Sequence, residues 1–521
     1  MKLGIDFGTT RIVVAASDRG NYPVVSFETP DGASEEWFPP LVALRGGERL
    51  FGWDAYARQA DPEWTVIRSL KRLLEDAGPN TSLEIAGQTV PLLDLLRGLI
   101  GSLKEALRAS STLPGLDTRT LEVMLGVPAH ANTNQRFLTA EAFRQSGFDV
   151  LGILNEPSAA SIEYGHRTKT EIRATQSMLV YDLGGGTFDV SLVEYDDKTH
   201  SVIATEGIGA LGGDDFDHLL ADLALETAGL TMDSLTTSEL FRLLEECRHK
   251  KEALHPQTRK MVIDFDLVRE GLAPVSVSVP TFYERSRPYV EETLHAVRDM
   301  LEKSSTGSID SLYVTGGGSE LPLVSRMLRE EFGRRVKRSA HTRSATAIGL
   351  AIQADASSGY ELRERFTRYF GVWREADSGN RIIFDPLFPK GAPLPAPGEA
   401  SLEITRAYHP VHNIGHFRYL ECSQLTQDCQ PAGDITIWDE ILFPFDPALH
   451  QAPSLTNLPV SFCQDATSQV IEEHYRCEPG GFVVVSIRNR TAGYERSWSL
   501  GRWAVKTKPL PPVRKRRGAS A

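Results

Sequence analysis

The sequence contains little cysteine, no long apolar run and no excess of positive charge. None of its 521 residues lies in a stretch of 18 apolar residues, so we expect no membrane-spanning helix. The first residues, MKLGIDFG, have no basic segment followed by a long apolar core, so we expect no signal peptide. The net charge of −13 argues against general nucleic-acid binding. We therefore expect a cytoplasmic protein that binds no nucleic acid.

The few cysteines do not form a metal-binding pattern. Four of the five, Cys422, Cys429, Cys463 and Cys477, lie near the C-terminal end, which raises the question of a zinc site. None belongs to a C-x-x-C pair, and Cys422 and Cys429 are too far apart for a zinc knuckle. We interpret the cysteines as thiols of a protein in a reducing compartment.

Two copies of one glycine-threonine turn are the most informative feature of the chain. The first is DFGTT, Asp6 to Thr10, and the second is DLGGGTFD, Asp182 to Asp189. Each lies between apolar runs of strand length, which predicts two β-hairpin tips. Glycines let N–H groups surround an anion, threonine hydroxyls add donors, and an acid that opens the turn suits a hydrated divalent cation. The pair predicts a duplicated half-domain that holds one polyphosphate from both sides; two ordinary hairpins are the alternative.

Residues 1–355 alternate between expected helices and strands. Helices are expected at 92–109, 135–145, 238–253 and 289–303, and strands at 121–127, 178–181 and 311–314. This mixture predicts an α/β architecture.

The composition of the sequence changes beyond residue 355. The small, polar stretch ADASSG, at 354–359, indicates a boundary. Frequent prolines between Asp385 and Val460 exclude long helices there. Short alternating runs predict strands at 402–408, 435–438, 473–477 and 482–488, the last two flanking a turn at Pro479-Gly480-Gly481. We expect an all-β domain at 367–505 and a basic, disordered tail at 506–521, with a basic cluster at Arg514, Lys515, Arg516 and Arg517.

Hydrolysis of a nucleotide needs more than turns that hold phosphate. A lysine should offset the charge of the γ-phosphate, and acids should organise the water shell of a metal and orient the attacking water. The candidates are Lys71 in IRSLKRLLED, Glu156 in ILNEPSAASIEYG, and Asp189 in the second turn. Glycines in ALGGDDFD and LYVTGGGSELP would let a ligand come close to the backbone at two further places. The second group of glycines is expected to face a nucleoside.

With these motifs the chain resembles the 70-kDa heat-shock protein (DnaK-type) chaperones of the actin-like ATPase superfamily. The matching stretches, in family order, are IDFGTT, LKRLL, GVPAHANTNQRF, ILNEPSAASIEYG, YDLGGGTFDVSLVE, ALGGDDFD and VTGGGSELP. The resemblance implies an actin-like ATPase domain at 1–355, a polar linker at 356–366 and a β-sandwich that binds polypeptide at 367–505. It implies ATP or ADP with Mg²⁺, slow ATP hydrolysis, extended polypeptide clients, and J-domain or nucleotide-exchange co-chaperones. Pro128 and Arg136 fall at the family's proline switch and arginine relay.

The resemblance also implies a role for individual residues. The catalytic ones are Lys71, which neutralises charge, Glu156 and Asp189, which position metal and water, and Thr9 and Thr187, which contact phosphate. The nucleotide-binding ones are Gly8, Thr9, Thr10, Gly184, Gly185, Gly186, Thr187, Gly212, Gly213, Lys251, Gly316, Gly317 and Gly318. Asp6 and Asp182 are implied to hold Mg²⁺ through water.

Several features depart from the family. Glu320 replaces the arginine that stacks on adenine, Arg248 and His255 replace an acid and a serine that bind adenosine, and Arg343 replaces another acid. The apolar linker is replaced by ADASSGYELRERFTR, which we expect to have no apolar run to dock on the ATPase domain, and we expect no counterpart of the helical lid. Two other hypotheses therefore stay open: a nucleotide-sensing adaptor with one dedicated protein partner, and a small-molecule kinase of the same superfamily.

Overall fold

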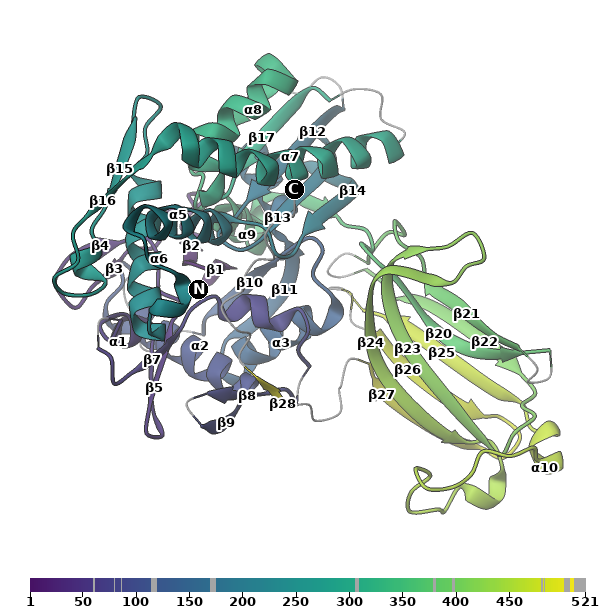
Figure 1. The fold of residues 1–521 in the computed structure, drawn as a ribbon. Helices are drawn as coiled ribbons and strands as arrows, with labels where there is room; N and C mark the ends of the chain where they lie inside the picture. Colours follow the sequence, from purple (N-terminus) through teal and green to yellow (C-terminus); the bar gives the residue numbers. More distant parts are fainter. Residues whose placement is uncertain are drawn as a thin grey trace.

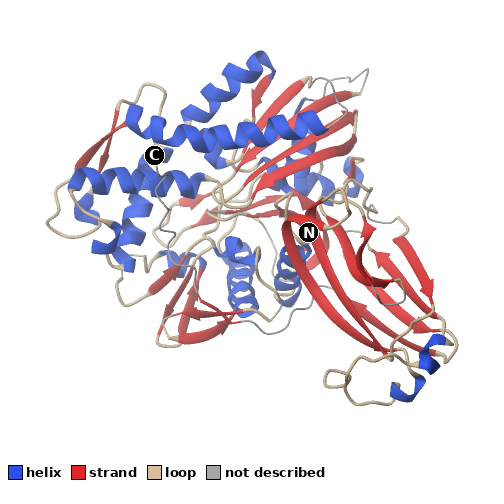
Figure 2. Cartoon of the chain, turned by 45° about the vertical axis from the view of Figure 1, so that its right-hand side comes forward, coloured by secondary structure: helices blue, strands red, loops and turns tan. Residues whose placement is uncertain are grey.

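The chain folds into an α/β domain of two lobes with a β-sandwich at one side (Figures 1 and 2). The computed structural model describes residues 1–500, apart from 60, 79, 86, 114–119, 169–174, 305–308, 378–380, 396–398, 479–480 and 482, and also residues 507–509. The predicted fold class, a duplicated α/β domain followed by an all-β domain, is confirmed. No helix in this described part is long and apolar enough to cross a membrane.

Lobe I is built on a sheet with the strand order β11-β10-β1-β2. Its strands are β1 (Lys2–Phe7), β2 (Ile12–Ala16), β10 (Glu122–Val127) and β11 (Asp149–Asn155). β1 and β2 form an antiparallel hairpin, and β10 lies parallel to β1. Its other elements are β3 (Phe27–Glu28), β4 (Ser34–Glu35), β5 (Val42–Arg45), β6 (Glu48–Phe51), α1 (Gly52–Tyr56), β7 (Thr65–Ile67), η1 (Leu70–Leu74), β8 (Ser82–Ile85), β9 (Gln88–Pro91), α2 (Leu92–Ala109) and α3 (Thr133–Gln145).

Lobe II repeats this arrangement with the order β18-β17-β12-β13-β14-β19. Its strands are β12 (Gln176–Leu183), β13 (Phe188–Asp196), β14 (Thr199–Ile208), β17 (Ser311–Thr315), β18 (Val336–Arg338) and β19 (Glu361–Arg363). β12 and β13 form the hairpin, and β17 lies parallel to β12, as β10 does to β1. Its other elements are α5 (Gly213–Ala228), α6 (Thr237–Glu252), β15 (Lys260–Ile263), β16 (Val275–Ser278), α7 (Val279–Lys303) and α8 (Pro322–Phe332). The duplication predicted from the two turns is thus present in the topology.

The expected helices form because their apolar residues recur on one face. In α2 the buried residues are Leu92, Leu95, Leu96, Leu99, Ile100, Leu103 and Leu107, a spacing of three and four. α3 starts with a capping box at Asn132 and ends just before Gly147, whose φ of +78° suits glycine. The helix expected at 289–303 starts earlier, at Val279, and contains Pro288 in its interior.

Two helices pack between the sheets of the two lobes. α4 (Glu156–Thr168) and α9 (Ala345–Ala354) pack closely because small residues face each other. A Cβ on Gly349 would lie 1.8 Å from the carbonyl oxygen of Ala159, so only glycine fits this crossing.

The C-terminal domain consists of two four-stranded antiparallel sheets, which face each other as a sandwich (Figure 2). One has the order β21-β20-β23-β24, with β20 (Tyr369–Ala376), β21 (Arg381–Phe388), β23 (Ile414–Leu425) and β24 (Pro431–Pro444). The other has the order β22-β25-β26-β27, with β22 (Leu402–Tyr408), β25 (Ile471–Cys477), β26 (Val483–Asn489) and β27 (Tyr494–Ser499). The core between them includes Phe370, Tyr419, Trp438 and Tyr475. β25 and β26 pair as predicted, whereas Pro479 and Gly480 of their turn lie outside the described residues.

The segment predicted to be an undocked linker is attached to lobe II. Strand β19 pairs in parallel with β14, and Leu362 in its centre is only 5% exposed. The backbone N–H of Asn155 donates to Glu364 Oε1 at 2.9 Å, and Arg365 Nε donates to the carbonyl oxygen of Val202 at 2.9 Å. The expectation that this polar stretch cannot dock is therefore wrong, because an edge strand needs only backbone pairing and one buried apolar side chain.

The sequence predicts a C-terminal tail that is disordered throughout. Three of its residues instead form β28 (Thr507–Pro509), which runs parallel to β8 of lobe I. The basic cluster at 514–517 lies outside the described residues.

Candidate active site

A cavity between the two lobes gathers most of the residues that the sequence singled out. Those lining it are Asp6, Gly8, Thr9, Thr10, Lys71, Glu156, Asp182, Gly184, Gly185, Thr187, Gly213, Lys251, Gly316, Gly317 and Gly318. Three predicted residues do not line it: Gly186, Gly212 and Asp189. Residues from distant parts of the chain therefore meet at one place.

The two glycine-threonine turns face each other across this cavity. A Cβ on Gly185 would lie 2.0 Å from Thr10 Oγ1, and one on Gly186 would lie 2.6 Å from Thr9 Oγ1. The turns approach so closely that side chains at these glycines are excluded. The arrangement leaves backbone N–H groups and threonine hydroxyls around one small space, as an anion site requires.

Close backbone packing also fixes the second pair of glycines. Gly213 N donates to the carbonyl oxygen of Gly184 at 2.9 Å, and a Cβ on Gly212 would lie 2.7 Å from Gly185 backbone atoms. Lys251 Nζ donates to the carbonyl oxygen of Gly213 at 2.6 Å. Gly212 thus supports the second turn from behind, whereas Gly213 reaches the cavity.

Lys71 and Glu156 form a buried ion pair inside the cavity. Lys71 lies on η1 and Glu156 opens α4, and Nζ and Oε1 are 2.5 Å apart. Burial raises the pKa of Glu156 to about 7, against the opposing charge of Lys71 and with a further contribution from Asp6. Burial would lower the pKa of Lys71, but Glu156 and Asp6 hold it above its usual value. The lysine is therefore charged, and the glutamate can gain or lose a proton near neutral pH.

Two aspartates at the ends of β1 and β12 complete the acidic part of the site. Burial raises the pKa of Asp6, and burial together with Glu156 and Asp6 raises the pKa of Asp182. Asp6 Oδ1 is buried and has no hydrogen-bond partner. No group of three or more His, Cys, Asp or Glu side chains in the described part of the chain is placed to hold a metal directly. That Asp6 and Asp182 hold Mg²⁺ through water stays a prediction.

Asp189 lies behind the cavity wall and is held by a residue that the sequence did not reveal. Its Oδ1 accepts from the backbone N–H of Ala129 at 2.8 Å and lies 2.9 Å from His130 Nδ1. Burial would lower the pKa of His130, but Asp189 raises it above its usual value. A lone histidine in GVPAHANTNQRF carries no sequence signal for this contact. Nearby, Arg136 donates to the side chain of Asn155, whose backbone N–H donates to Glu364 of the linker segment.

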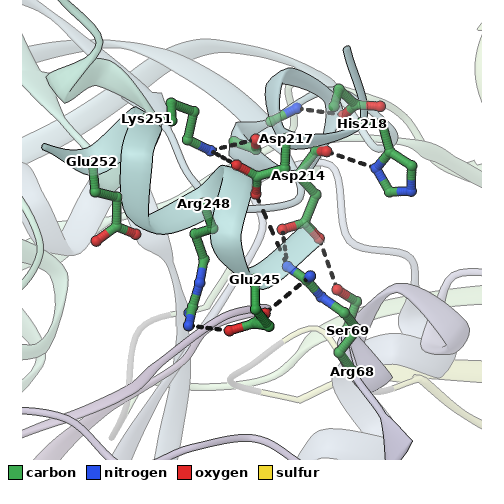
Figure 3. A network of polar contacts seen from close by, with 12 residues as sticks. Arg68, Ser69, Asp214, Asp217, His218, Glu245, Arg248, Lys251 and Glu252 are labelled. Carbon is green, nitrogen blue, oxygen red and sulfur yellow. Dashed lines mark hydrogen bonds and ion pairs between the residues drawn. The ribbon is translucent and has the colours of Figure 1, made fainter. Parts of the chain in front are cut away.

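Beside this cavity, charged residues bridge the lobes (Figure 3). Arg68 of lobe I contacts Asp214 at 3.3 Å and Glu245 at 3.0 Å, both in lobe II, and Ser69 Oγ donates to Asp214 at 2.7 Å. Burial would raise the pKa of Asp214, but Arg68 and other neighbouring cations lower it to about 2. Sequence reasoning missed this network, since its members are separated by more than a hundred residues.

The four residues at which the sequence departs from the family pattern lie in different places relative to the cavity. Arg248 and Arg343 line the cavity, and Glu320 binds Arg343 just outside it. His255 is exposed and does not line the cavity.

The β-sandwich contains a separate cavity of about 770 Å³ where two neighbouring strands part. β20 pairs with β23 from Tyr369 opposite Cys422 to Trp373 opposite Arg418, and the ladder stops there. Residues 374–376 and 414–417 continue as strands and line this cavity. It therefore offers two strand edges on opposite walls.

The wall of this second cavity contains partly buried, ion-paired side chains. Arg374 donates to both carboxylate oxygens of Glu473 at 2.8 Å, and its Nε donates to Asp385 at 2.7 Å. Arg406 binds the same Asp385. These ion pairs make the cavity partly polar.

Comparisons with known proteins agree with the geometry. A family model described as Hsp70 protein matches residues 104–366. A chaperone protein HscA homolog of Methylibium petroleiphilum is 34% identical over 375 residues, which are 68% of this chain and 58% of that protein. A chaperone protein HscA homolog of Burkholderia multivorans is 33% identical over 378 residues, 69% of this chain and 59% of that protein. The match thus spans less than two thirds of the length of these relatives.

Proposed function

The chain belongs to the Hsp70 family, and on this premise we propose that it is an Mg²⁺-dependent ATPase with chaperone activity. The single observation that carries the proposal is the meeting of both glycine-threonine turns, Lys71 and Glu156 in one cavity. Phosphate donors, a buried cation and a titratable carboxylate are the groups that phosphoryl transfer to water requires.

In this proposal the turns hold the phosphates, and the side chains of Lys71, Glu156 and Asp189 act on the reaction. Thr9 and Thr187 donate to phosphate oxygens, and Lys71 neutralises the charge that develops on the γ-phosphate. Glu156 accepts a proton from the attacking water, which its pKa of about 7 permits. The hydroxyl forms a bond to the γ-phosphorus while the bond to the β–γ bridging oxygen breaks. ADP and phosphate are the products. Asp189, which is hydrogen-bonded to Ala129 and His130, would help Glu156 to position the metal and the attacking water.

The residues present fit a hydrated Mg²⁺. Burial and the neighbouring Glu156, Asp6 and Asp189 raise the pKa of Asp182, and Lys71 is the cation that opposes them. Asp6 Oδ1 has no partner although it is buried, which is costly unless a ligand supplies a donor or a positive charge. Mg²⁺ keeps several waters and pairs with phosphates, so Asp6 and Asp182 would hold its water shell. When bound, the ion would neutralise phosphate charge.

We propose that the cavity of the β-sandwich binds an extended polypeptide. Two strand edges on opposite walls suit a third strand between them, since its backbone groups can hydrogen-bond to either side. Apolar residues such as Trp373, Val411 and Ile414 would contact its side chains. The docked strand β19 would provide a physical route between the two sites, since Arg365 donates both to the carbonyl oxygen of Val202 in lobe II and to that of Gly391 in the β domain.

A second candidate is a nucleotide-sensing adaptor with one dedicated protein partner. The observation that favours it is the set of ion pairs from Arg68 to Asp214 and Glu245, which ties the lobes together and would slow nucleotide exchange. Co-chaperone partners stay predictions under either proposal.

ATP turnover of the full chain, with and without a reduced unfolded protein, separates the two candidates. A chaperone should show ATP turnover that changes when client is added. An adaptor should bind ATP with negligible turnover in both conditions. Absence of ATP binding would contradict both.

A further inference from the structure

A small third cavity lies where lobe I, the segment that follows β19 and the β-sandwich meet. Its volume is about 40 Å³, and its wall includes Arg136 of α3, Arg365 and Arg368 of the connecting segment, and Trp438 of β24. None of these four residues lines the cavity between the lobes or the larger cavity of the β-sandwich. One water needs about 10–15 Å³ of such space, so the third cavity has room for roughly three waters or one small ion.

Positive charge exceeds negative charge on the wall of this third cavity. Among the described residues, Arg136, Arg365 and Arg368 line it together with one acid, Glu421. Arg368 Nε lies 3.5 Å from Glu421 Oε1, which balances one of the three cations. Arg365 binds two backbone carbonyl oxygens, at 2.9 Å and 2.8 Å, and these carry no net charge. The described part of this wall therefore has two more cations than acids.

The guanidinium group of Arg136 is buried and incompletely satisfied. The residue is 7% exposed, and among the described residues its side chain donates only to the side chain of Asn155, from Nη2. Its Nη1 is buried without a hydrogen-bond partner in the described structure. Burial lowers the pKa of Arg136, although Glu364 and Glu421 act in the opposite direction. A buried cation that its neighbours do not fully compensate is stabilised by an anion.

Trp438 supplies a second donor without a partner, from the other domain. Its side chain is 1% exposed, and its Nε1 has no hydrogen-bond partner among the described residues. The indole N–H can only donate, so the group that satisfies it must be an acceptor. A water would accept from both donors, but it would leave the excess positive charge of the wall uncompensated.

We propose that the third cavity binds one small inorganic oxyanion, phosphate or sulfate, that accepts from Arg136 and Trp438. The volume excludes a nucleotide, and an ion with oxygens on all sides can accept from donors of different parts of the fold. Lobe I, the connecting segment and the β-sandwich all contribute to the wall, so a bound ion favours the arrangement in which the three are in contact.

Calorimetric titration of the full chain with sulfate at constant ionic strength tests the proposal. We expect saturable binding at one site. Trp438→Phe keeps an aromatic ring beside Phe370, whose ring centroid is 4.3 Å away, and removes the N–H. It should weaken sulfate binding about tenfold or more, the usual effect of losing one hydrogen bond to a charged group. Arg136→Gln should weaken it further, because it also removes a charge, and it tests the site separately if Trp438→Phe does not fold.

Two controls place the ion in this cavity. Trp373→Phe is the matched substitution, since Trp373 lies in the same domain and lines only the larger cavity, and it should leave sulfate binding unchanged. Lys71→Ala alters the cavity between the lobes and should also leave it unchanged. Sulfate binding that is lost in Lys71→Ala and kept in Trp438→Phe would overturn the proposal, as would the absence of saturable binding. Acetate that binds as tightly as sulfate would overturn the assignment to an inorganic oxyanion.

Discussion

Replacement of Lys71 by alanine should slow ATP hydrolysis far more than it weakens nucleotide binding. The two turns remain in place and supply the phosphate donors, so the ground state keeps most of its contacts. The transition state, in contrast, loses the buried cation beside the γ-phosphate. Removal of one such preorganised partner typically costs about 10²–10³ in rate, or about 2.7–4 kcal/mol.

The same substitution should change how the rate depends on pH. Lys71 lowers the pKa of Glu156, which burial otherwise raises, so without the lysine that pKa lies above about 7. At neutral pH the variant's Glu156 is then mostly protonated and cannot accept a proton from water. Part of the lost rate should return as the pH rises, whereas the parent should change less over the same interval.

Single-turnover release of phosphate, combined with calorimetry of nucleotide binding, separates these effects. Lys250→Ala is the matched control, because Lys250 pairs with Glu246 at 3.3 Å and does not line the cavity. It should match the parent in both measurements. Unchanged turnover in Lys71→Ala, or an equal loss of binding and turnover, would refute the role assigned to this lysine.

Three further predictions follow from the same geometry. Asp6→Asn and Asp182→Asn should each weaken Mg²⁺-dependent nucleotide binding, and an Mg²⁺ titration identical to the parent's would rule out the two-sided site. The pKa of Glu156 is about 7 in the folded protein without nucleotide, against a usual value of 4.5 in the unfolded chain. Between these two pH values the folded protein therefore keeps a proton on Glu156 that the unfolded chain loses. The unfolding free energy should therefore fall as the pH rises through this interval. Glu156→Gln should flatten this part of the plot of unfolding free energy, measured with denaturant, against pH. An unaltered slope in the variant would contradict the raised pKa of Glu156. Leu362→Ala should weaken docking of β19 by about 2–5 kcal/mol, seen as faster proteolysis at 356–366, whereas exposed Glu361→Ala should have no such effect.

The features that depend on neighbouring residues were the most predictable from sequence. The turns at Gly8 and Gly185 were recognised from glycine, threonine and flanking apolar runs, and both are hairpin tips. Helix α2 matches its expected bounds because its leucines recur at three and four residues. The placement of Lys71 and Glu156 in one cavity needed the family resemblance, since 85 residues separate them in the chain.

The features that depend on pairing across the fold were missed. The contacts from Arg11 to Glu252 and from His130 to Asp189 join residues that no local pattern connects. Docking of the 356–366 segment was missed because its composition is polar, although Leu362 and the β14 edge suffice to hold it. Average composition could not reveal an interaction that rests mainly on backbone hydrogen bonds.

The most direct test of the account is phosphate release from ATP by the purified full chain, measured with Mg²⁺ and again with the metal chelated. The account predicts release that requires Mg²⁺ and that is lost in Lys71→Ala while nucleotide still binds. Release that is insensitive to both chelation and the substitution would show that hydrolysis does not occur between the two turns. If the unmodified protein binds ATP but releases no phosphate, the proposed ATPase activity is contradicted and the nucleotide-sensing adaptor remains as the proposed function.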